Sequence, residues 1–276
     1  MYPFLHTEES KCNIKVKLNI LFTLNGCVGH LSKSDIRIIN DLIILGRATP
    51  EELSDGRQTI CAAEFSEEFG LVRLYPTRWD MQLNRWNKVS VPVEKPVRPQ
   101  YDYRDESWKI HGSRSEWDRL SDKIKPTGTL KKRSDRISLV QSLGSGCTSN
   151  LWPDGKSLGV IKPTIERFYF EENPRKKNVR QQSLDGSFRM MVKDDFDYIP
   201  RVQYRCSDCK AKGPHNQQIL EWGFYEGMRK NPNDINKVWD NVGFSSMDEW
   251  DFYFLVGNLY TKPKAFNVIC VFRWKK

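Results

Sequence analysis

Residues 58–93 decide the fold, and they read QTICAAEFSEEFGLVRLYPTRWDMQLNRWNKVSVPV. This stretch holds three short apolar segments, with a turn after the first, at residues 58–65, 71–75 and 87–93. The second segment alternates, and the valines of the third share one face, which is the period of a half-buried strand. Short strands at close spacing with turn signals predict a small β-sandwich or β-barrel.

A similar pattern returns in the second half of the chain. Apolar and aromatic segments predict strands at residues 157–161, 165–170, 188–192, 199–205, 252–256 and 266–274. Residues 219–230 predict a helix, because Leu220, Phe224 and Met228 form one stripe and Pro232 ends it. The sequence therefore predicts a mainly β protein with added helices, an α+β fold.

The junction between the two halves shows in composition. Residues 123–136 are basic and residues 143–155 are rich in Gly and Ser, so we place the domain boundary between residues 123 and 153. We expect an N-terminal extension over residues 1–35 and a first domain over residues 36–130. A second domain, with an inserted helix and a loop of cysteines and histidine, is expected over residues 150–276.

The charge balance bears on the partner. The chain has 276 residues, with 44 Lys and Arg against 35 Asp and Glu, which gives a net charge of +9. A basic surplus favours a polyanionic partner, most often nucleic acid, although it also keeps a protein soluble. No apolar run approaches the ~18 residues of a membrane span, and the N-terminus lacks the cationic start of a signal peptide. The seven cysteines are odd in number and mostly scattered, so we expect a cytoplasmic protein without a disulfide framework.

The sequence resembles the dual OB-containing domain family of prokaryotic defence loci in several segments and in the order of those segments. The resemblance rests on Gly70–Pro76, Trp86–Val93, Lys162-Pro163, Tyr204-Arg205-Cys206, Glu221-Trp222 and Phe266–Phe272. It implies two tandem OB-like barrels and a nucleic-acid context. The sequence departs from the family pattern in the spacing between its cysteines and His215. It also has Gly223 where the family has an acidic residue.

The most specific chemical motif is Cys206-Ser207-Asp208-Cys209 with His215. Two thiolates at CxxC spacing hold Zn²⁺ from one turn, and an imidazole six residues further closes around the same ion. A structural zinc site needs four ligands, so Cys61, Cys147 or Cys270 would supply the fourth. The alternative is a reduced turn whose cysteines pack as small apolar groups. We therefore expect no cofactor or one structural zinc.

Three basic segments are candidate contacts for nucleic acid. On and after the predicted strand at residues 71–75, arginines alternate with aromatic rings, as a single-strand binding surface requires. The alternative puts Tyr75 and Trp79 in the barrel core and leaves the arginines solvated. The other two are the densest cationic stretches, which suit a phosphate backbone or a solvated loop equally well. The candidate residues are Arg73, Tyr75, Arg78, Trp79, Lys131, Lys132, Arg133, Arg175, Lys176 and Lys177.

The sequence therefore predicts an accessory or sensing module that binds single-stranded nucleic acid, DNA or RNA, with weak sequence specificity. No catalytic motif is present, so no catalytic residue is assigned and an enzyme is disfavoured. A second hypothesis is a protein-interaction adaptor among defence proteins, using aromatic surface such as Trp250 and Trp274. A third is a metal-dependent nuclease using Asp208 and Glu221 near His215.

Overall fold

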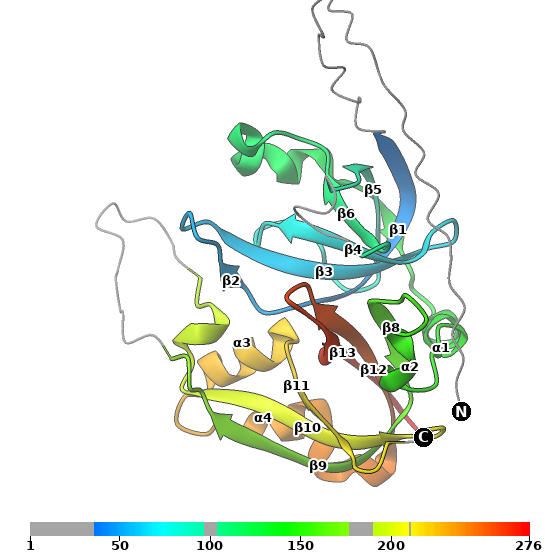
Figure 1. The fold of residues 1–276 in the computed structure, drawn as a ribbon, viewed down its shortest axis with the longest axis vertical. Coiled ribbons are helices and arrows are strands. Elements are labelled where there is room, and N and C mark those ends of the chain that lie inside the picture. The colour runs from blue at the N-terminus through cyan, green and yellow to red at the C-terminus, as the bar shows by residue number, and fades with distance from the viewer. Residues whose placement is uncertain (1–35, 97–103, 177–189, 210) are drawn as a thin grey trace, which may run out of the picture. The chain divides into compact units, whose positions relative to one another are not determined.

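The first half closes into a five-stranded β-barrel. The computed structural model describes residues 36–96, 104–176, 190–209 and 211–276. The barrel strands are β1 (Arg37–Arg47), β3 (Gln58–Ser66), β4 (Gly70–Thr77), β5 (Asn87–Glu94) and β6 (Ser107–Ile110). They pair in the order β1-β3-β4-β6-β5, and β5 returns to β1. The β4–β6 pair is parallel and the other pairs are antiparallel (Figure 1). The predicted barrel is confirmed, and its topology is consistent with an OB-like fold.

Alternation along the strands fills this barrel. Val89, Val91 and Val93 are fully buried, together with inward residues of the other strands. The outward residues Ile43, Leu45 and Ala63 are also buried, because the second half of the chain covers that side. Two short strands extend the barrel sheet: β2 (Glu51–Glu52) pairs with β3, and β7 (Lys125–Thr129) pairs with β5.

The described residues of the second half form six strands in two three-stranded sheets. One sheet runs β11-β10-β9 and the other runs β13-β12-β8. Their bounds are β8 (Leu158–Ile161), β9 (Pro163–Glu172), β10 (Tyr198–Cys206), β11 (His215–Gln218), β12 (Trp250–Leu259) and β13 (Lys262–Lys275). A single parallel bridge between Ile219 and Val268 joins the end of β11 to β13. A fold that is mainly β is thus confirmed for the whole described chain.

Helices of the second half cover an aromatic core. Helix α3 (Trp222–Lys230) buries Phe224, Tyr225 and Met228, and α4 (Lys237–Val242) adds Trp239. The predicted helix therefore exists, although residues 219–221 of the prediction lie between β11 and α3, where Ile219 and Glu221 form isolated β-bridges. The predicted strand at residues 188–192 is wrong for residues 190–192, which have no strand, and residues 188 and 189 lie outside the described residues. The remaining helical turns are η1 (Arg114–Lys123), η2 (Lys193–Asp195) and η3 (Phe244–Glu249).

The basic connector is folded. It contains β7, α1 (Arg133–Ser142) and α2 (Thr148–Leu151). Helix α1 buries Val140 in a cluster that draws on both halves, with Leu45 and Ala63 from the barrel and Leu255 and Phe272 from β12 and β13. Residues 34–276 accordingly form one compact unit. At this seam a Cβ on Gly46 would lie 2.6 Å from Cβ of Cys270, so only glycine allows the strands this approach.

Candidate metal centre and basic surface

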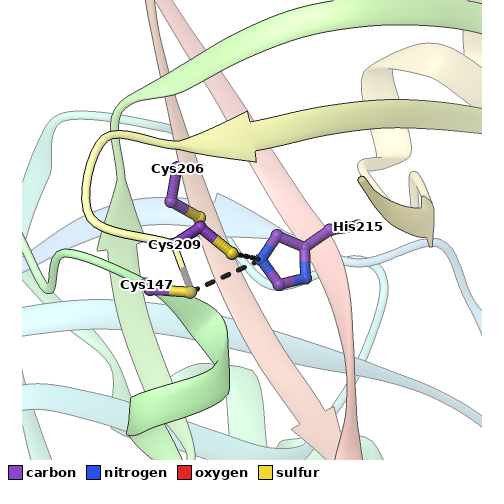
Figure 2. Close-up of side chains that lie close together, drawn as sticks. All are labelled: Cys147, Cys206, Cys209 and His215. Atoms are coloured by element: carbon purple, nitrogen blue, oxygen red, sulfur yellow. Dashed lines mark hydrogen bonds between the residues drawn. The ribbon is translucent and has the colours of Figure 1, made fainter. Parts of the chain in front are cut away.

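The β10–β11 hairpin brings the three predicted ligands together. Cys206 ends β10, and Cys209 lies in the following turn, where its N–H donates to the Cys206 carbonyl. His215 begins β11 opposite Tyr204. Cys147, which precedes the first turn of α2, approaches from the other side. Figure 2 shows the three sulfur atoms and the imidazole pointing toward one another.

The ligand atoms are spaced as around one ion. The four candidate ligand atoms lie within 4.8 Å of one another. Nε2 of His215 is 3.1 Å from Sγ of Cys209 and 3.4 Å from Sγ of Cys147. Zn–S bonds of ~2.3 Å and Zn–N bonds of ~2.0 Å in a tetrahedron put such ligand atoms roughly 3.5–3.8 Å apart. The arrangement therefore needs little movement to enclose a zinc ion.

Neighbouring groups orient these ligands. Oγ1 of Thr148 contacts the His215 ring, 3.3 Å from Nδ1 and 3.4 Å from Nε2, while Nε2 also faces two of the sulfurs. The N–H groups of Ser149 and Ala211 donate to Sγ of Cys147 and of Cys209, each at 3.4 Å. Such N–H donors favour thiolates, the form that binds metal. In the metal-free protein, burial raises the pKa of Cys206 to about 12 and lowers the pKa of His215.

The fold selects Cys147 from the three cysteines considered for the fourth ligand. Cys61 lies on β3, where its sulfur contacts Arg73. Cys270 lies on β13, fully buried, where its thiol donates to the Leu45 carbonyl. Because α2 follows α1 in a segment without strong periodicity, spacing alone did not distinguish these residues.

The centre has the composition of a closed structural site. Three thiolates and one imidazole complete a tetrahedron and leave no open position for substrate. Of the acids considered for a nuclease, Glu221 accepts hydrogen bonds from Arg85 and from the Val271 N–H. Asp208 is exposed beside its neighbour Ser207. Neither carboxylate is among the four grouped ligands.

The arginine and aromatic stretch on β4 is largely engaged within the protein. Arg73 is 2% exposed, so our expectation of an open binding surface is wrong for this residue. The Tyr75 hydroxyl donates to Glu51, and Arg78 forms ion pairs with Asp80 and Asp118. Trp79 is half-buried. Strand β4 lies between two packed surfaces, so both of its faces are largely buried. Alternation in the sequence does not show whether the second face of a strand is covered.

The two loop segments are exposed. Lys131, Lys132 and Arg133 lead into α1, and Arg133 donates to the Lys275 carbonyl at 2.9 Å. Arg175 and Lys176 follow β9, and Lys176 is paired with Asp197. Lys177 lies outside the described residues.

Sequence reasoning named Trp274 as aromatic surface, but it did not place Trp86 beside the first loop. The Arg136 guanidinium lies 5.3 Å from the ring of Trp86, and Phe272 stacks on Trp274. Trp86 in turn contacts Phe272, with ring centroids 5.5 Å apart. We call these residues the α1 patch: Trp86, Lys131, Lys132, Arg133, Arg136, Trp274 and Lys275. The sequence marked the basic run and Trp274 separately, but only the fold brings them together with Trp86, because these residues are distant in sequence.

Comparisons with known proteins add little. A family model described as "Domain of unknown function (DUF8758)" matches residues 39–141, less than half of the chain. No curated protein matches this chain. Three chains of solved structures match. One, titled "Structure of murine DNA binding protein bound with ds DNA", is 10% identical and covers 88% of this chain and 96% of its own, at a TM-score of 0.31. A likeness that weak carries no argument about function. No helix in the described ranges is long and apolar enough to cross a membrane.

Proposed function

We propose that this protein binds nucleic acid, preferentially single-stranded, through the α1 patch and with little sequence preference. The carrying observation is the trio Lys131, Lys132 and Arg133, which is exposed at the start of α1. In the described part of the chain no carboxylate lies within ion-pair distance of these three side chains. Their charges are therefore available to phosphate groups.

The aromatic part of the patch supports the same proposal. Trp86 and Trp274 are half-buried, so each keeps part of its ring accessible beside the cations. Bases stack on such rings with ~1–3 kcal/mol each, and Lys or Arg neutralises the neighbouring phosphates. Two acids lie in or beside the patch. Asp135 is in the first turn of α1, and Glu249 lies 3.7 Å from Lys275, so Lys275 contributes less free charge than the three basic residues at the start of α1.

Changing Lys131, Lys132 and Arg133 together to Ala tests the proposal. The triple variant should bind a fluorescent single-stranded oligonucleotide more weakly. Its slope of log affinity against log salt should fall by about 2, because each lost phosphate contact on a single strand removes ~0.7. Fluorescence anisotropy at several salt concentrations measures both quantities.

The matched control removes the same charge elsewhere, with Lys230, Lys237 and Lys264 changed to Ala. These exposed lysines lie on α3, α4 and β13. The control should keep the wild-type slope. If both triple variants lose affinity equally, only the net charge matters and the patch is not the interface. A wild-type protein that does not bind the oligonucleotide even at low salt would instead favour the adaptor hypothesis, in which the partner is a protein bound through an apolar interface.

We also propose that Cys147, Cys206, Cys209 and His215 hold one structural zinc ion. Four ligands of the preferred type and two atom separations near those of a tetrahedron support this. When bound, zinc would supply only cross-linking, because the donor set has no open position. The side chains themselves would join α2 to the β10–β11 hairpin.

A second barrel is part of the proposal. Residues 162 and 163 join β8 directly to β9, so the two strands act as one bent strand. Pairing then runs β9-β10-β11, crosses the parallel bridge to β13, continues to β12 and returns to β8. This circuit matches that of the first barrel and supports tandem OB-like barrels over residues 36–130 and 150–276. Membership of the dual OB-containing domain family, a defence role and a cytoplasmic location remain predictions.

A further inference from the structure

A cavity of about 120 Å³ lies between the first barrel and the hairpin of β12 and β13. Thr49, Cys61 and Tyr75 line it from the first half, and Asn258 and Tyr260 line it from β12 and the turn that follows. The charged lining residues are Arg73, Arg104, Lys193 and Glu51. Three cations thus face one carboxylate.

Arg73 is the unusual member of this lining. It is 2% exposed, yet no carboxylate of the described residues pairs with it. Nη2 donates to the Ser157 carbonyl at 3.0 Å and Nη1 contacts Sγ of Cys61 at 3.3 Å, while Nε has no partner. Glu64 lies near enough to interact with this charge, and Glu106 is linked to it through the Ser157 hydroxyl, but neither carboxylate accepts a hydrogen bond from the guanidinium. Arg73 therefore keeps a buried N–H donor, at Nε, that an acceptor in the cavity would satisfy.

Two other lining residues can accommodate an acceptor. Glu51, the one carboxylate among the described lining residues, already accepts hydrogen bonds from Lys193 and Tyr75. Oγ1 of Thr49 is buried without a partner and can donate to an oxyanion, whereas the unpartnered Oδ1 of Asn258 is an acceptor and suits a protonated oxygen of that ion. A Cβ at residue 257 would come within 3.1 Å of Nη2 of Arg73, so glycine there leaves the guanidinium its space.

We propose that this cavity binds a small oxyanion, with phosphate as the best fit, and that Arg73 is its principal ligand. Arg104 and Lys193 add positive charge, and the Thr49 hydroxyl is a further donor. The cavity is large enough for several waters or for one such ion. The phosphate would be free in solution or would be the terminal phosphate of a nucleotide or strand. The proposal does not depend on binding of nucleic acid at the α1 patch.

Thermal unfolding in phosphate tests this site. At constant ionic strength, phosphate should raise the Tm of the wild type over chloride, by about 3–6 °C at ten times its Kd. Cys61→Asp places a tethered carboxylate where a thiol already contacts Arg73, so this variant should fold and lose the response. Cys61→Ser keeps a neutral acceptor at the same position and should respond as the wild type does.

A second set of ligands distinguishes the two possible sources of the anion, a free ion and the end of a strand. Short oligonucleotides with a 5′-phosphate or a 5′-hydroxyl are compared with inorganic phosphate, using the triple alanine variant of the α1 patch. A response to inorganic phosphate assigns a free ion, and a response only to the 5′-phosphate assigns a strand end. No response to either probe, or an equal response in Cys61→Asp and wild type, overturns the proposal. If the α1 patch proves not to bind nucleic acid, this result is unaffected.

Discussion

Glu64 is a carboxyl group enclosed in the first barrel. Its side chain is fully buried on β3, and Oε1 has no hydrogen-bond partner. Burial raises the pKa of Glu64 well above its usual value, and the N–H of Leu74 and the charge of Arg73 offset this only in part. The residue is therefore neutral over a range of pH in which the unfolded chain would ionise it.

This sets the sign of a pH dependence. The folded state holds the proton more tightly, so the contribution of Glu64 to stability is complete below its unfolded pKa and is lost as pH rises toward the folded pKa. Glu64→Gln cannot ionise, so it should gain relative to wild type by about 1.4 kcal/mol for each pH unit in that window. Thermal melts from pH 5 to 8 measure the gain.

Glu67→Gln provides the control for this measurement, because it makes the same substitution at an exposed glutamate of the turn after β3. A Glu64→Gln variant whose stability difference from wild type stays constant with pH would contradict the raised pKa.

The sequence predicted some residues of the candidate sites correctly and others not. The ligands Cys206, Cys209 and His215 lie within one hairpin, so spacing alone found them. Cys147 reaches the centre only through the packing of α2. Arg73 was expected at the surface, since alternation on β4 does not tell a solvated face from one covered by the second half of the chain.

Among elements, the Cys₃His centre ties α2 to the β10–β11 hairpin. If the proposed zinc is bound, the purified protein should contain about one equivalent. Cys209→Ser should then lose the ion and lower the Tm on the order of 10 °C, because metal binding is coupled to folding. Elemental analysis and a melting curve measure the two effects.

Cys61→Ser is the matched control. Cys61 lies away from the Cys₃His centre, so this variant should keep the zinc. Loss of stability without any zinc in the wild-type protein would show that these cysteines act by packing alone.

Elements with an apolar period were predictable, and those without one were not. β4 and β5 alternate clearly. β7 has the sequence KPTGT with every residue exposed, and only its pairing with β5 makes it a strand. Helix α1 buries Val140 alone, so its sequence resembles a basic loop. The segment predicted to be a connector is therefore folded in the structure, although its sequence shows no clear strand or helix pattern.

At the scale of the whole molecule, the two halves share part of their core. The cluster that contains Leu45, Val140 and Phe272 belongs to neither half alone. We therefore expect one cooperative transition on heating, with a ratio of calorimetric to van't Hoff enthalpy near 1. Gly46→Ala, which crowds Cys270 at the seam, should lower that single Tm. Two separate calorimetric peaks in the wild type would show independent domains.

The shared cluster also affects how the chain is made. Domains generally fold as they leave the ribosome, beginning from the N-terminus. Here the outer side of β1 and β3 is covered by β12 and β13, which follow them by most of the second half of the chain. The nascent first barrel therefore exposes an apolar surface until β12 and β13 have been made. A premature stop that removed only β13 would leave that surface open, and chaperones or proteases would recognise the product.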